Sequence, residues 1–228
     1  MKITVKPEVF KKHPDLKLVF ILASEIDNHS KLKESKYLLQ EIEQLQRLTI
    51  HKDKVKTHHL LSPWSLAQRE FGKKAHHYHT SVEKLLAKVL KKRTTATKNA
   101  FTNILNFMML KHTIPGGALD LFKINGDITY SLASGREKKG MTAKVKRGDI
   151  IYKDKNNLLG SKLDAYNAKK STITKYSTKS LVHFDILPPI TAKETSELLQ
   201  ETTDLLKEFC EAECKVFILD RKHKSHKL

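Results

Sequence analysis

A proline followed by two glycines stands in the middle of the chain, at Pro115, Gly116 and Gly117. Backbone amides of a glycine-rich loop can stabilise the oxyanion that forms when water attacks an ester, without a side-chain nucleophile. Asp120 and Glu137 follow and can position that water or an amino group. The alternatives are structural: the glycines permit a tight connection between a helix and a strand, Asp120 caps a turn, and Glu137 is a solvated loop charge. The residues alone leave both interpretations open.

Histidines gather at residues 58–59 and 76–79, and two cysteines stand at Cys210 and Cys214. Adjacent side chains on a helix diverge by about 100°, so neighbouring histidines do not chelate one metal. The cysteines are four residues apart on a predicted helix, a spacing that does not suit a disulfide. We therefore expect no metal site and no cofactor, and we expect reduced thiols packed beneath the helix.

Basic residues outnumber acidic ones and give the chain a formal net charge of +18. So large a charge favours association with a polyanion and says nothing about the fold. Two groups are candidates for contacting a phosphate backbone: Lys88, Lys91, Lys92 and Arg93 after one helix, and Lys144, Lys146 and Arg147 before one strand. Part of the first group also has a structural explanation, because cations at the C-terminal end of a helix interact favourably with the helix dipole. Nucleic acid is the first partner to consider.

The elements that must position these residues are predicted from hydrophobic periodicity and helix caps. Thr80 with Glu83, and Thr191 with Glu194, each form a capping box that begins a helix. The remaining predicted elements are helices over 31–48, 64–71 and 101–110, and strands over 3–5, 16–22, 128–132, 149–152, 181–187 and 214–219.

This order of elements predicts an α+β (or α/β) fold, a single domain in which a mixed β-sheet is covered by helices. We expect the domain to span residues 1–220, with a mostly helical half at 1–112 and a half of strands with one C-terminal helix at 113–220. The basic tail at 221–228 is expected to be disordered. Without an apolar stretch of about 20 residues or a secretory signal, the protein is expected to be cytoplasmic, with no membrane partner.

Residues 64–86, 106–120, 125–137 and 149–154 carry a recognisable pattern. These four segments resemble the B3/4 domain, the tRNA-editing domain of the phenylalanyl-tRNA synthetase β chain. Residues 106–120 resemble the family pattern Asn-x-x-Met-Leu followed by Pro-x-His-Ala-Phe-Asp, and residues 125–137 resemble its Gly-x-Ile, Ala and Gly-Glu sequence. Residues 149–154 resemble its strand ending in aspartate, and residues 64–86 the start of the free-standing B3/4-domain proteins. The resemblance runs over residues 2–220 and implies the same fold.

The resemblance also implies roles for particular residues. Asn106 matches an asparagine that lines the editing pocket, whereas the histidine that helps hold the mischarged ester falls on Gly117. A phenylalanine two residues later falls on Leu119. The candidate pocket residues are Asn106, Pro115, Gly116, Gly117, Asp120 and Glu137.

Three functions remain open at this point. The first is a tRNA-binding protein that hydrolyses mischarged aminoacyl-tRNA in trans, as the resemblance implies for a free-standing domain. The second is an RNA-binding module without catalysis, which glycine at position 117 favours. The third is a small-molecule-binding domain whose basic surface reflects only its cellular environment. For the first two, the expected partner is tRNA or aminoacyl-tRNA.

Overall fold

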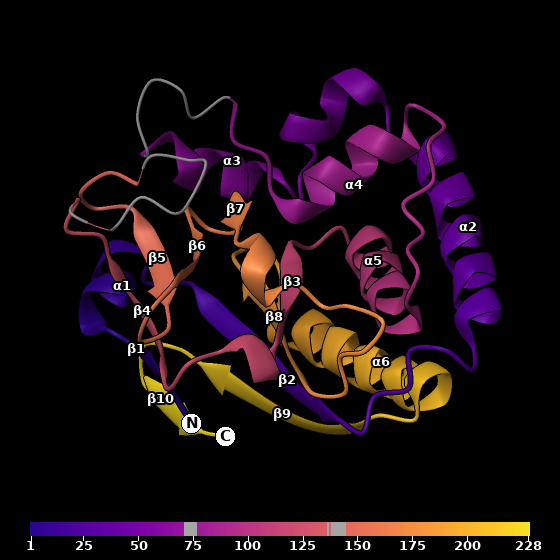
Figure 1. Cartoon of the computed structure of the whole chain (residues 1–228). Helices are drawn as coiled ribbons and strands as arrows, with labels where there is room; N and C mark the ends of the chain where they lie inside the picture. Colours follow the sequence, from indigo (N-terminus) through magenta and orange to yellow (C-terminus); the bar gives the residue numbers. More distant parts are fainter. Residues whose placement is uncertain (71–76, 136, 138–144) are drawn as a thin grey trace.

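The computed structural model of this chain, drawn in Figure 1, describes residues 1–70, 77–135, 137 and 145–228. The helices among these residues are α1 (Pro7–Lys12), α2 (Leu32–Thr49), α3 (Ser62–Arg69), α4 (Ser81–Val89), α5 (Ala100–His112) and α6 (Ala192–Cys210), with short 3-10 helices at η1 (Lys52–Thr57), η3 (Leu121–Lys123) and η4 (Lys169–Ser171).

The described strands form two sheets, whereas the sequence predicted one. The first sheet contains, in spatial order, β10 (Ser225–Lys227), β1 (Lys2–Val5), β4 (Ile128–Leu132), β5 (Ile150–Lys153), β6 (Leu158–Ser161) and β7 (Tyr166–Asn167). The second contains β3 (Gly116–Asp120), β8 (Ser180–Ile186), β2 (Lys17–Ser24) and β9 (Glu213–Leu219). Strands β1 and β4 are parallel and the other pairs are antiparallel, so the first sheet is mixed. The α+β class and the covering by helices are confirmed.

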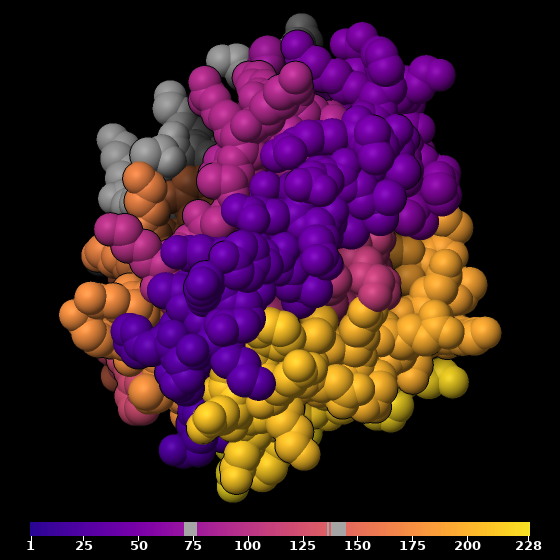
Figure 2. Space-filling model, turned by 90° about the vertical axis from the view of Figure 1, so that its right-hand side faces the viewer, coloured from indigo at the N-terminus to yellow at the C-terminus, as the bar shows by residue number. Residues whose placement is uncertain are grey.

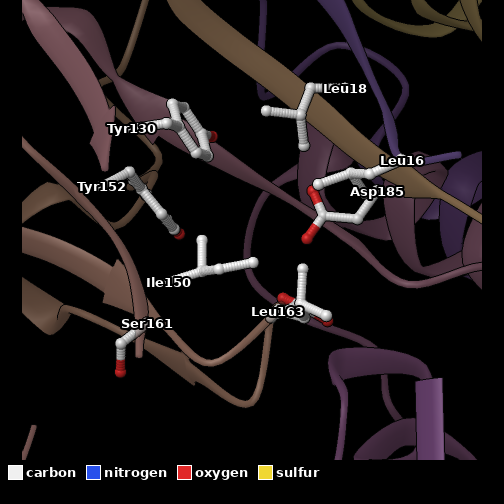
Figure 3. A pocket seen from close by; sticks show the side chains of 9 residues that line it. Leu16, Leu18, Tyr130, Ile150, Tyr152, Ser161, Leu163 and Asp185 are labelled. Carbon is white, nitrogen blue, oxygen red and sulfur yellow. The ribbon is translucent and has the colours of Figure 1, made fainter. Parts of the chain in front are cut away.

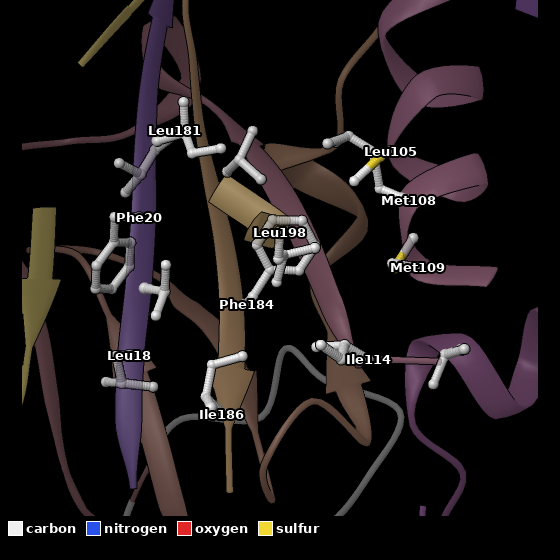
Figure 4. Close-up of a cluster of buried hydrophobic side chains, with 14 of the residues drawn as sticks. Leu18, Phe20, Leu105, Met108, Met109, Ile114, Leu181, Phe184, Ile186 and Leu198 are labelled. Atoms are coloured by element: carbon white, nitrogen blue, oxygen red, sulfur yellow. The ribbon is translucent and has the colours of Figure 1, made fainter. Parts of the chain in front are cut away.

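The central strands of the second sheet, β8 and β2, are buried on both faces, which explains why they are nearly continuous apolar runs. One face packs on α5 and α6 through side chains such as Phe184, Leu198 and Met108 (Figure 4). The other face meets the first sheet, where the ring of Phe20 in β2 lies edge-on to Tyr130 in β4 at 6.1 Å. The molecule thus has three layers: the helices, the second sheet in the centre, and the first sheet on the other side.

Helix ends follow the sequence closely where a cap was predicted. Both capping boxes are formed. The side chains of Thr80 and Thr191 accept hydrogen bonds from the backbone amides of Glu83 and Glu194, and the carboxylate of each glutamate accepts one from the backbone amide of its threonine. Helix α6 therefore begins where the sequence predicts but ends at Cys210. Cys214 lies on β9 and not on the helix, as a correction to the predicted spacing, and both thiols are free.

The C-terminal tail is ordered, in contrast to the expected disorder. Strand β10 pairs with β1, with Ile3 opposite His226, and the amide of Val5 donates to the carbonyl of Lys224 at 2.8 Å. The ring of His226 stacks on Phe217 at 4.0 Å. Backbone hydrogen bonds do not depend on side-chain charge, so a basic segment can complete a sheet edge. The two termini therefore lie side by side (Figure 1).

Segments distant in sequence also share the surface. Figure 2 shows the N-terminal segment, coloured indigo and violet, directly against the yellow C-terminal segment, and α2 contacts α6. No helix within the described ranges has the length and apolar character needed to cross a bilayer.

Candidate functional site

The two glycines of the predicted loop lie in strand β3 at the edge of the second sheet. A Cβ on Gly116 would lie 2.5 Å from Cδ1 of Phe184 and 2.7 Å from the carbonyl oxygen of His183, closer than real contacts allow. The left-handed residue of the connection from α5 is Thr113, with φ of 54°. The glycines therefore form part of a strand, and not the loop or tight turn that was expected. Close packing against β8 requires glycine at 116.

His183 of β8 fills the space beside Gly117. A Cβ on Gly117 would lie 2.9 Å from Nε2 of His183, whose side chain is 2% exposed. Position 117 is where the resemblance expects a pocket histidine, and an imidazole from the neighbouring strand occupies that space instead. Glycine at 117 is therefore coupled to histidine at 183 by sterics.

Asp185 orients the imidazole of His183. Both residues are buried on the same face of β8, because alternate residues of a strand point the same way. Nδ1 of His183 lies 3.4 Å from Oδ1 of Asp185, and the amide of Asp185 donates to the carbonyl of Pro115 at 3.3 Å. A carboxylate that orients an imidazole is the arrangement that general bases use.

Two tyrosines of the first sheet cover this pair. The ring of Tyr152 meets His183 edge-on at 5.7 Å and stacks on Tyr130 at 4.9 Å. The hydroxyl of Tyr152 donates to Asn167. A Cβ on Gly160, opposite Tyr152 on β6, would lie 2.1 Å from the Tyr152 ring, so glycine is needed there for the ring to lie flat.

A third acidic group comes from a left-handed turn. Residues Lys162, Leu163 and Asp164 have φ angles of 60°, 51° and 61°, a conformation that costs each of them about 1–3 kcal/mol. Asp164 accepts from the amide of Ser81 at 2.6 Å, at the first residue of α4. Nζ of Lys162 lies 2.8 Å from Oδ2 of Asp149, and both side chains are buried. The turn is thus fixed at both ends by charged groups in the interior.

The carboxylates set the electrostatics of His183. Burial lowers its pKa, but the hydrogen bond and charge of Asp185 and the charge of Asp164 raise it more, so the pKa lies above its ordinary value. Burial, with the charge of Asp185, raises the pKa of Asp164. Burial likewise raises the pKa of both tyrosines, so their hydroxyls remain protonated. The neighbouring carboxylates therefore favour the protonated imidazole of His183.

A small cavity lies beside this cluster (Figure 3), with a free volume of about 10 Å³, which suits a single water molecule. Its lining includes Leu18, Tyr130, Tyr152 and Asp185 from the two sheets, and Asp164 from the left-handed turn. Figure 3 shows the carboxylate of Asp185 directed toward the other lining side chains. An aminoacyl group is many times larger than this volume, so the cavity does not admit one in this conformation.

The predicted pocket residues separate into two sets. Pro115, Gly116 and Gly117 lie against His183 and Asp185. Asn106, Asp120 and Glu137 lie elsewhere.

Each residue of the second set has local partners. Nδ2 of Asn106 donates to the carbonyl of Thr95 at 3.0 Å, within the helical layer. Asp120 caps η3 through the amide of Phe122 at 3.1 Å and accepts from the Ser177 hydroxyl at 2.6 Å.

Glu137 accepts from the amides of Ser134 at 2.7 Å and Gly135 at 2.9 Å. Burial raises its pKa, but these hydrogen bonds lower it more, so the carboxyl stays ionised below its ordinary range. The contacts of Asp120 match its predicted role as a turn cap, and Glu137 lies in a loop, as its structural alternative expects.

The predicted basic residues are exposed but form two separate groups. Lys88, Lys91, Lys92 and Arg93 lie at the end of α4, and Lys146 and Arg147 lie before β5. In Figure 1 the end of α4 lies near α2, whereas the segment before β5 lies at the opposite side of the molecule. Lys144 is outside the described residues.

Sequence reasoning missed the interior cluster. The signal was present: His183 and Asp185 are the two polar residues of a short apolar run and are separated by one residue, so they share a strand face. Asp164 carried no such signal, because only the left-handed turn brings it inward. In the described part of the chain, no three histidine, cysteine, aspartate or glutamate side chains gather as a metal-binding group.

Comparison with known families gives one match. The model of the B3/4 domain matches residues 64–211, well over half of the chain, and this range contains the interior cluster. It omits β1, β2, α2 and the C-terminal strands, which complete both sheets. No curated protein matches the sequence.

Proposed function

Since the chain belongs to the B3/4-domain family, whose domain also occurs in the phenylalanyl-tRNA synthetase β chain, we propose that it binds tRNA. The observation that carries the proposal is the net charge of +18 in a chain of this family. A polyanion releases counterions when lysine and arginine contact its phosphates, which supplies affinity without reading sequence.

The arrangement of the interior supports binding without ester hydrolysis. An editing site must admit an aminoacyl group, and the cavity beside His183 has room for about one water molecule. The pocket residue best matched to the synthetase, Asn106, is committed to a backbone carbonyl. The same small volume disfavours the alternative of a small-molecule-binding domain with its ligand at this cavity.

Charge reversal at the end of α4 tests the proposal. Lys88→Glu should weaken tRNA binding and reduce the slope of log affinity against log salt by about 1, because one phosphate contact is lost. Fluorescence anisotropy of labelled tRNA measures both quantities. Lys207→Glu is the matched control, since Lys207 also lies in the last turn of a helix begun by a capping box. Equal effects of the two variants would mean that the α4 group has no specific role.

A second candidate function, hydrolysis of the aminoacyl ester, is favoured by one observation. His183, oriented by Asp185, lies directly beside Gly117, and an imidazole in that arrangement can take a proton from an attacking water. This activity requires that the sheets separate enough for an ester to reach the histidine.

Incubation with correctly and incorrectly charged tRNA separates the two candidates. We expect wild-type protein to bind aminoacyl-tRNA without shortening the lifetime of the ester. Release of amino acid by the wild type that is lost in His183→Gln, with tRNA binding retained, would instead establish hydrolysis. Asn106→Ala serves as a second variant, because the resemblance implies a pocket role for Asn106.

A further inference from the structure

Two aromatic rings stand almost fully in solvent on neighbouring segments. Phe122 is 74% exposed and Tyr176 is 75% exposed, the highest values among the phenylalanine, tyrosine and tryptophan residues that the structure describes. Phe122 belongs to η3 and Tyr176 to the segment that leads into β8. Rings of this size are normally covered, since each contributes to the core when buried.

Direct hydrogen bonds hold the two segments together. The amide of Leu121 donates to the carbonyl of Lys179 at 3.1 Å, and Nζ of Lys123 donates to the carbonyl of Thr172 at 2.7 Å. The hydroxyl of Ser177 donates to Asp120 at 2.6 Å. Helix η3 is thus tied at several points to residues 172–179, and it also packs against η4.

The exposed charges of residues 121–124 and 165–179 are all positive. The stretch 165–179 contains no aspartate or glutamate. The carboxylate of Asp120 is buried, and Nζ of Lys123 neutralises it at 3.1 Å. Nζ of Lys175 lies 4.8 Å from the centre of the Tyr176 ring. We call the exposed members the aromatic–lysine patch: Phe122, Lys123, Lys169, Lys170, Lys175 and Tyr176.

This composition suits one kind of ligand. Aromatic rings stack on unpaired bases and lysines contact the phosphates between them, whereas the bases of a duplex are not accessible to such rings. We propose that the aromatic–lysine patch binds unpaired nucleotides of RNA, with Phe122 and Tyr176 stacking on bases. This inference rests on the proposed tRNA binding and identifies the single-stranded part of that ligand as the segment contacted here.

An anionic membrane offers related chemistry but fits less well. Binding in a bilayer interface relies on a continuous apolar face. Here exposed polar residues flank Tyr176 on the same stretch: Thr172, Thr174 and Thr178. A surface of two rings, several lysines and threonines therefore favours nucleotides.

The experiment compares a short unstructured RNA of about ten nucleotides with a duplex of the same length. Phe122→Ala and Tyr176→Ala should each reduce affinity for the single strand by about tenfold, and should leave duplex affinity unchanged. Tyr176→Trp should restore binding, because it retains a stacking surface. Circular dichroism should show no change in folding, since both rings lie in solvent.

Tyr37→Ala is the matched control. Tyr37 is a 54% exposed ring on α2 with Nζ of Lys33 5.8 Å from its centre, so it has the same chemistry at another position. An equal loss in Tyr37→Ala, an equal loss for duplex, or unchanged binding in the patch variants would overturn the inference. Binding to phosphatidylserine vesicles is measured with the same variants. The inference would also be overturned if the patch variants lost binding to these vesicles but retained binding to RNA.

The two proposals fail in distinguishable ways. Wild-type tRNA binding with no effect of the patch variants would remove only the patch. Absence of binding to tRNA, duplex and single strand alike would remove the proposed function and the patch together.

Discussion

The imidazole of His183 limits which residue can stand at position 117. The imidazole lies where any side chain at position 117 would have to lie, with Nε2 2.9 Å from the position of a Cβ. A histidine at 117 and a histidine at 183 therefore could not occupy this site together. Glycine at 117 and the buried histidine on β8 are two aspects of one packing arrangement.

The raised pKa of His183 gives a pH dependence of stability. A folded-state pKa above 6.5 means that the folded protein binds the proton more tightly than the unfolded chain. The stabilisation is fully present below pH 6.5 and is lost as the pH rises through the folded pKa. The raised pKa of Asp164 acts in the same direction. Denaturant unfolding at a series of pH values measures the effect.

Asp185→Asn provides the control for this assignment. Asp185 supplies the largest contribution that raises the pKa of His183, so the variant should titrate at lower pH. The imidazole Cε1 proton, followed by NMR, reports that titration directly. A His183 pKa at or below 6.5 in the wild type would contradict the described geometry.

At the scale of elements, β10 should contribute to stability although it is short and basic. Its His226 stacks on Phe217, and such an aromatic pair is worth about 1 kcal/mol. We expect His226→Ala to lower the free energy of unfolding by about that amount, because the ring that covers Phe217 is lost. Lys227→Ala on the same strand should change it by less than about 0.5 kcal/mol.

Urea denaturation measures both variants. Equal free energies of unfolding for the two variants would mean that the contact of His226 in β10 with Phe217 in β9 does not stabilise the fold. A C-terminus that is disordered in solution would give the same null result for His226→Ala.

How far the sequence predicts an element depends on whether its signal is local. The capping boxes at Thr80 and Thr191 predict helix starts correctly because all partners lie within one turn. Strand β10 was missed because its pairing with β1 joins the two ends of the chain. Strand β3 was missed because Gly116 and Gly117 have low strand propensity and are selected by packing against β8.

The site follows the same rule. The polar pair in β8 was readable as two residues on one face of an apolar strand. Asp164 was not, because three successive left-handed residues turn it inward and no periodicity encodes that conformation. The resemblance assigned Asn106 to the pocket, but its partner, the carbonyl of Thr95, is fixed only by the fold.

At the scale of the whole molecule, charge is divided between surface and interior. The surface carries the excess of lysine and arginine, whereas the interior holds His183, Asp185, Asp164 and the Lys162–Asp149 pair. Association with a polyanion uses the first set and needs no opening of the fold. Hydrolysis would use the second set and needs the sheets to separate. The cavity beside His183 is too small for an aminoacyl group, so we propose binding and not hydrolysis.

The most direct test of this claim is the affinity of the wild-type protein for tRNA as a function of salt. We predict tight binding at low salt that weakens at least about tenfold between roughly 50 and 200 mM, because phosphate contacts release counterions. Negligible binding, or binding that is insensitive to salt over that range, would contradict the account.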